Sequence, residues 1–141
     1  MTTSEYELVR ETPSVEDYLR VRKAAGLGAK SLEGARRGLP NTMFAAQALY
    51  QGEVVAFCRL IGDGGLFYMV TDGVVVPEHQ GRGLGRLVLG ECAEYFKKTA
   101  PPGAYLMGMS VSPEFVKKVG FDTVSPSETG VFIWLPATRG E

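Results

Sequence analysis

The chain has very few of the residues that hold metal ions or disulfide frameworks. Its 141 residues include two cysteines, Cys58 and Cys92, and a single histidine, His79. The cysteines show no Cys-x-x-Cys spacing, whereas metal sites and disulfide scaffolds gather several such residues at short intervals. We therefore expect neither a metal site nor a disulfide framework.

Long apolar runs and an excess of one charge are also missing. No apolar stretch approaches the roughly 20 residues that a membrane-spanning helix needs, and the first residues lack the basic start and apolar block of a signal peptide. The formal net charge is −1, whereas nucleic acids and anionic membranes usually select a basic surface. These absences argue against nucleic-acid and membrane partners and predict a cytoplasmic protein.

The composition that remains is that of a globular protein. Hydrophobic residues make up 45% and charged residues 22% of the chain, a balance typical of folded domains. A length of 141 residues suffices for one hydrophobic core and is too short for two ordinary ones. We expect a single domain over residues 1–141.

Residues 74–87 are the most informative segment, with the sequence Val-Val-Val-Pro-Glu-His-Gln-Gly-Arg-Gly-Leu-Gly-Arg-Leu. A strand here leads into glycines at alternate positions and then into a helix. Such glycines let successive backbone N–H groups converge, and the helix adds its unpaired amides and positive dipole end. The segment therefore predicts a loop that binds an anion. The segment fits neither the dinucleotide-binding pattern Gly-x-Gly-x-x-Gly nor the Walker pattern of a phosphate-binding loop. The alternative to an anion site is a glycine-rich turn in an unrelated α/β protein.

The periodicity of apolar residues and the turn signals predict the other elements. We expect helices near residues 15–25, 31–38, 84–98 and 113–119, and strands near 6–11, 43–50, 54–61, 66–76, 104–109, 121–124 and 131–135. A tight hairpin at residues 62–65 would place Arg59 opposite Tyr68 and Ile61 opposite Leu66. Gly73, inside a strand, is expected to mark a β-bulge.

The glycine-rich segment resembles the Gln/Arg-x-x-Gly-x-Gly/Ala signature of the GCN5-related N-acetyltransferase (GNAT) family, at Gln80, Gly83 and Gly85. Residues 115–121, Phe-Val-Lys-Lys-Val-Gly-Phe, are similar to a second family landmark. There Val116 replaces a common tyrosine. The resemblance spans residues 6–135. It implies an α/β fold with a mixed, mostly antiparallel sheet of about seven strands flanked by helices, in which the fourth and fifth strands splay apart.

The resemblance also implies an activity, which is acetyl-CoA-dependent transfer of an acetyl group directly to a primary amine of a small molecule. A homodimer is compatible with it. Because Val116 departs from the family pattern, the alternative is a non-catalytic protein that binds or senses acyl-CoA. The residues expected to contact the cofactor are Val74, Val75, Val76, Gln80, Gly81, Arg82, Gly83, Leu84, Gly85, Arg86 and Phe115.

Two residues are predicted to act in catalysis. An alkyl amine is mostly protonated near neutral pH because its pKa is about 10, so a base is needed. Asp72, an acid within an apolar strand and next to Gly73, is predicted to be that base; the alternative is a structural ion pair with Arg59. Tyr105, at the start of a strand, is predicted to protonate the departing thiolate, and simple packing is its alternative.

Overall fold

The protein is described by a computed structural model over residues 5–108, 117–122 and 135. Within these residues the backbone forms one five-stranded sheet in the order β1-β2-β3-β4-β5. The strands are β1 (Tyr6–Val9), β2 (Phe44–Tyr50), β3 (Glu53–Gly62), β4 (Phe67–Val75) and β5 (Tyr105–Met107). The first four pair antiparallel, and β5 runs parallel to β4.

The sheet described here does not match the prediction of about seven strands. The further strands predicted at 121–124 and 131–135 fall largely outside the described residues, and the helix predicted at 113–119 falls there in part. Every other predicted helix and strand is present.

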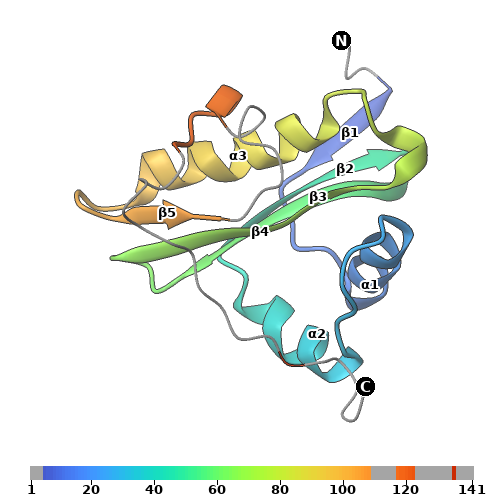
Figure 1. Ribbon diagram of the computed structural model, residues 1–141, viewed down its shortest axis with the longest axis horizontal. Helices are drawn as coiled ribbons and strands as arrows, with labels where there is room; N and C mark the ends of the chain where they lie inside the picture. The colour runs from blue at the N-terminus through green and yellow to red at the C-terminus, as the bar shows by residue number, and fades with distance from the viewer. Residues whose placement is uncertain (1–4, 109–116, 123–134, 136–141) are drawn as a thin grey trace.

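Helices cover both faces of the sheet, as Figure 1 shows. Helix α3 (Leu84–Thr99) lies on one face, and α1 (Val15–Ala24) and α2 (Leu32–Gly38) lie on the other. Aromatic contacts mark both layers: Tyr68 of β4 meets Phe96 of α3 edge-on at 5.0 Å, and Phe57 of β3 stacks on Tyr18 of α1 at 5.5 Å. The sheet is thus buried on both sides.

Local sequence signals set the ends of the first two helices. The Ser14 side chain accepts a hydrogen bond from the Asp17 amide at the start of α1, and Ser31 does the same for the Gly34 amide at α2. These side-chain caps satisfy amides that a helix leaves unpaired. Just after α1, Gly26 has a φ of 75°, the left-handed conformation that glycine adopts readily. The predicted helix starts and stops are confirmed.

The register of the β3–β4 hairpin differs from the prediction. Arg59 pairs with Thr71 and Ile61 with Met69, so the predicted pairings with Tyr68 and Leu66 are wrong. The reason is the turn. The Asp63 carboxylate accepts hydrogen bonds from the amides of residues 65, 66 and 67. The turn therefore closes over residues 64–66, where the Asp63 amide donates to the Phe67 carbonyl, in place of the predicted residues 62–65, and the strand pairing shifts by three positions.

Strands β4 and β5 separate soon after they meet. Their pairing covers only Phe67 to Met69 on β4 and Tyr105 to Met107 on β5. From Val70 to Val75, β4 has no strand partner on this edge among the described residues. This is the separation that was expected between the fourth and fifth strands, and it leaves backbone groups of β4 along this edge without a strand partner among the described residues.

Candidate active site

The glycine loop, residues 80–86, connects the end of β4 to α3 through a short 3-10 helix, η2 (Pro77–His79). Gly81 and Gly83 have φ values of 78° and 81°, a backbone region that costs other residues about 1–2 kcal/mol. Gly83 is the N-cap of α3 and provides no side-chain cap. The sequence therefore needs glycine at both positions to turn the chain into the helix.

The amides of this loop are available to an external acceptor. Residues 84, 85 and 86 form the first turn of α3, whose amides have no intrahelical acceptor, and the first i to i−4 bond is Leu87 N–H to the Gly83 carbonyl. The amides of Gly81, Arg82 and Gly83 donate no backbone hydrogen bond within the described chain. The first turn of α3 contains no acidic residue. A cluster of unpaired amides at a positive dipole end is suited to an anion.

The end of β4 presents one backbone edge to the same region. The Val76 amide donates to the Val55 carbonyl, and the Val76 carbonyl accepts from the His79 amide, so the backbone of Val76 is fully used. Because backbone groups alternate along a strand, the Val75 groups face the opposite, open edge. The Gln80 side chain donates to the Val75 carbonyl at 3.0 Å, which leaves the Val75 amide as the donor that faces this edge.

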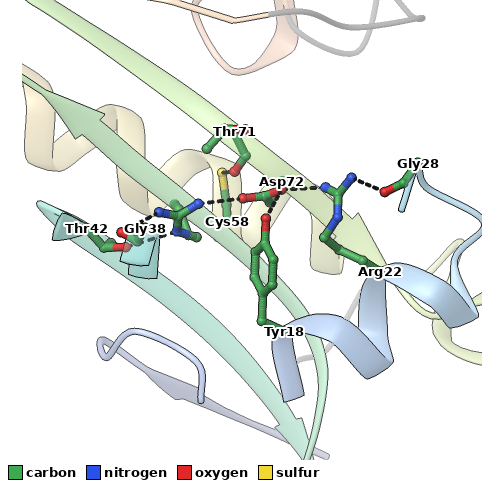
Figure 2. A network of polar contacts seen from close by, with 9 residues as sticks. Tyr18, Arg22, Gly28, Gly38, Thr42, Cys58, Thr71 and Asp72 are labelled. Atoms are coloured by element: carbon green, nitrogen blue, oxygen red, sulfur yellow. Dashed lines mark hydrogen bonds and ion pairs between the residues drawn. The ribbon is translucent and has the colours of Figure 1, made fainter. Parts of the chain in front are cut away.

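Asp72 lies at a bulge of β4 and is enclosed by partners (Figure 2). Two residues, Asp72 and Gly73, occupy the bulge between the pairs Arg59–Thr71 and Phe57–Val74. Asp72 itself has a φ of 63°, which rotates its side chain to the face that holds Arg59. The bulge predicted at Gly73 is therefore present, and Asp72 is its left-handed residue.

Both oxygens of the Asp72 carboxylate are occupied. Oδ2 accepts from Arg59 Nη1 at 2.9 Å, and Oδ1 accepts from Arg22 Nη1 and, at 3.0 Å, from the Tyr18 hydroxyl. The Asp72 side chain is 2% exposed, and those of Arg22 and Arg59 are 11% and 10% exposed. We call these four residues the Asp72 cluster.

The two arginines of the Asp72 cluster also bind the chain segments on either side of α2. Arg22 Nη2 donates to the Gly28 carbonyl at 2.7 Å, in the connection between α1 and α2. Arg59 Nε donates to the Thr42 hydroxyl at 2.9 Å, after α2. One carboxylate thereby links β4, β3, α1 and both ends of the α2 segment, as Figure 2 shows.

Tyr18 lies between the two cations. The guanidinium carbons of Arg22 and Arg59 are 5.7 and 5.6 Å from the centre of its ring, within the range of cation–π attraction. Burial, and next the negative charge of Asp72, raise the pKa of Tyr18 to about 12. The phenol therefore remains a neutral donor to Asp72 at any pH near neutrality.

The Asp72–Arg59 ion pair that the sequence left as an alternative is present. A general base needs a free lone pair within reach of the amine or of a water molecule, and the three donors around Asp72 occupy its oxygens on the side of α1 and β3. The contacts thus favour a structural role for Asp72, and its role as a base stays a prediction.

Tyr105 lies at the start of β5, opposite Phe67, and its ring stacks on Phe67 at 6.1 Å. The residue is 66% exposed. It is two residue pairs away from the last β4–β5 pair, about 7 Å along the strand. Its role as a proton donor stays a prediction. Phe115, predicted to contact the cofactor, lies outside the described residues.

Sequence reasoning missed Tyr18 and Arg22. They stand four positions apart on α1 and therefore project from one face of the helix. A positively charged residue on the inward face of an amphipathic helix was the available signal, because such a charge needs a buried partner. The sequence offered no way to identify that partner as Asp72, 50 positions away.

The comparisons with known proteins agree with this geometry. The model of the acetyltransferase (GNAT) family matches residues 6–121. The chain belongs to the GNAT family. It is therefore an N-acetyltransferase of the class that uses an acyl-CoA donor. No curated protein matches this chain significantly.

Solved structures share the GNAT fold with this chain. A Staphylococcus aureus protein of unknown function, described as a probable acetyltransferase, is 28% identical with a TM-score of 0.86, over 92% of this chain and 99% of that one. A GNAT family protein from Streptococcus pneumoniae is 23% identical with a TM-score of 0.75, over 94% and 99%. A Mycobacterium tuberculosis protein in complex with CoA is 14% identical with a TM-score of 0.67, over 86% and 76%.

Three further observations concern the described part of the chain. None of its helices is long and apolar enough to cross a membrane. No group of three or more His, Cys, Asp or Glu side chains within it is arranged to hold a metal ion. Cys58 and Cys92 are both buried and free.

Replacing Asp72 by asparagine tests its structural role. Asp72→Asn leaves two nearly buried guanidinium groups without their counter-charge, which typically costs about 3–5 kcal/mol. We expect urea unfolding to show a loss of that size. Glu53→Gln is the matched control, because Glu53 pairs with Arg20 of the same helix but is 68% exposed, and such a pair contributes about 1 kcal/mol or less.

The opposite result would reinstate Asp72 as the base. An Asp72→Asn variant with unchanged unfolding free energy, unchanged cofactor affinity and strongly reduced turnover would show that the carboxylate acts on the substrate.

Proposed function

We propose that this GNAT protein transfers the acetyl group of acetyl-CoA directly to a primary amine of a small molecule. The observation that carries the proposal is the row of glycine-loop amides without a backbone partner among the described residues, directly beside the edge of β4 that pairs with no strand there. Together they offer donors for a phosphate-bearing cofactor and for an extended arm that leads from it toward the opening between β4 and β5.

We assign the cofactor contacts to backbone groups that have no hydrogen-bond partner among the described residues. The amides of Gly81, Arg82, Gly83, Leu84, Gly85 and Arg86 would hold the pyrophosphate, and the two arginine side chains would add charge. Along β4 we assign the Val75 amide to the pantetheine arm, because the Val76 backbone is already paired and Val74 faces β3 in the ladder. Gln80 supports the site by its bond to the Val75 carbonyl.

The reaction needs two bond changes at the substrate. The neutral amine nitrogen attacks the thioester carbon and forms the C–N bond, and the C–S bond then breaks to release the thiolate of CoA. The attacking nitrogen passes its proton to a water molecule, and the thiolate takes a proton from a general acid, which is reprotonated by water. We assign Asp72 to holding the strand bulge, and we propose the Tyr105 hydroxyl as the donor to the thiolate.

The setting of the reaction is part of the same proposal. We propose that the chain acts in the cytoplasm as a single domain, on a small molecule. The near-zero net charge supports a substrate other than nucleic acid or a membrane surface. An assembly of two copies is compatible with the proposal and is not required by it.

The activity can be tested with the purified protein. We expect acetyl-CoA to bind in a calorimetric titration and CoA thiol to be released when a panel of primary amines is offered. Binding with no thiol release from any amine would support the alternative of an acyl-CoA sensor. Absence of binding would contradict the proposal for the cofactor.

The glycine loop can be tested by placing a side chain and a negative charge in it. Gly83→Glu is expected to weaken CoA affinity at least tenfold, because the carboxylate would compete for the amides that bind phosphate. Gly52→Glu is the matched control: Gly52 has the same φ of 81°, lies in the β2–β3 turn, and has no atom within 4 Å of an added Cβ.

Both glutamate variants should lose similar stability, because both residues must adopt a left-handed conformation. Only Gly83→Glu should lose affinity. Equal CoA affinities in the two folded variants would show that the phosphates bind elsewhere.

The Tyr105 hydroxyl can be removed without disturbing its ring. Tyr105→Phe keeps the stack on Phe67, so CoA affinity should not change, while turnover should fall about 100-fold or more if the hydroxyl acts as a general acid. Tyr95→Phe, which keeps a comparable stack on Phe44 at 4.5 Å, is the control. Equal turnover in both variants would remove Tyr105 from the mechanism.

A further inference from the structure

A buried phenol holds the side chain of an arginine in the glycine loop. Arg82 Nη1 donates a hydrogen bond to the Tyr6 hydroxyl at 3.1 Å. Tyr6 begins β1, on the far edge of the sheet from β4, and is 8% exposed. Arg82 is exposed. A residue from the first strand therefore fixes one nitrogen of a solvent-facing guanidinium.

The Tyr6 hydroxyl is itself held by His79. Its oxygen lies 2.8 Å from His79 Nδ1. Because Arg82 donates to this oxygen, the hydroxyl proton can point at His79, with Nδ1 as the acceptor. An order of donation from Arg82 to Tyr6 to His79 is the one that an imidazole with its proton on Nε2 permits, and it forms part of the proposal below.

Three aromatic rings make this arrangement rigid. The Tyr6 and His79 rings meet edge-on at 5.6 Å and 85°. Tyr50 of β2 packs against both, at 5.6 Å from Tyr6 and 4.7 Å from His79. The rings fix the position of the Tyr6 hydroxyl, and so fix the place where the guanidinium of Arg82 is bound.

We propose that Tyr6 and His79 are positioning residues that hold Arg82 ready to bind a phosphate group of the cofactor. The inference rests on the proposed function of the glycine loop. A guanidinium has five N–H donors in a fixed plane, and the contact with Tyr6 uses one nitrogen. The others remain for a phosphate, and the side-chain entropy that binding would otherwise remove is already lost.

A double-mutant cycle with CoA as the ligand tests this role. Tyr6→Phe should lower CoA affinity about threefold to tenfold, the range expected for immobilising one long side chain. In an Arg82→Gln background the same change should have almost no effect, because the side chain that Tyr6 positions is gone. Tyr50→Phe keeps the third ring and removes a hydroxyl from the same cluster, so its affinity should match that of the unchanged protein.

The outcomes separate this inference from the proposed function. If the unchanged protein fails to bind CoA, the proposed function is overturned. If it binds CoA but Tyr6→Phe has the same effect with and without Arg82, or no effect at all, only the positioning role is overturned.

Nitrogen NMR of His79 tests the order of donation, whereas the cycle with Arg82→Gln separates a positioning role of Tyr6 from a merely structural one. Nδ1 should be the unprotonated, hydrogen-bonded nitrogen in the unchanged protein, and its signal should shift in Tyr6→Phe and much less in Tyr50→Phe. A proton on Nδ1 in the unchanged protein at neutral pH would overturn the proposed order of donation.

Discussion

The buried carboxylate of Asp72 is the interaction on which the helical layer beside β3 and β4 depends. A charge that is almost fully removed from water must be compensated, and here two guanidinium groups and a phenol compensate it. Arg22 comes from α1 and Arg59 from β3. Each arginine also donates hydrogen bonds to residues before, after or at the end of α2. The position of the layer is therefore set by charge pairing as well as by apolar contact.

This charge could not reach its partners without the bulge. In a regular strand Asp72 would follow Thr71 onto the opposite face of the sheet, away from Arg59. Its left-handed backbone, with a φ of 63°, costs about 1–2 kcal/mol for a residue other than glycine. Three hydrogen bonds to an ionised acceptor, each worth about 1.5–3 kcal/mol, together exceed that cost. The backbone strain and the ion pairs are thus parts of one arrangement.

Local signals in the sequence predicted the elements well, and long-range contacts account for the errors. Ser14, Ser31 and Gly26 act on neighbours within four residues, so the helix ends could be found. The glycine loop was likewise recognisable from Gly81, Gly83 and Gly85. The predicted β3–β4 register was wrong because one carboxylate, Asp63, binds three amides and moves the turn toward residues 64–66, which no alternation of apolar residues reveals.

The candidate site could also be predicted only in part. Its local features were found from the sequence, and its long-range contacts were not. The loop amides follow from local backbone conformation, whereas the partners of Asp72 and Arg82 come from elements far away in the sequence. The Asp72–Arg59 ion pair was foreseen only as an alternative, and it forms because the bulge, and not the predicted register, brings Asp72 to the face of Arg59. Arg22, Tyr18 and Tyr6 come from the N-terminal elements, whose position on the sheet is a property of the whole fold.

These long-range contacts meet at the two ends of one short segment of β4 and its loop. At one end Asp72 ties the strand to α1 and to the connections around α2. At the other end Tyr6 ties Arg82 to β1. The Val75 amide lies between them and the loop amides lie beside Arg82, and these amides have no backbone partner in the described chain. The fold thus fixes this segment from both sides while leaving its donors free, which is the condition for a preorganised binding site.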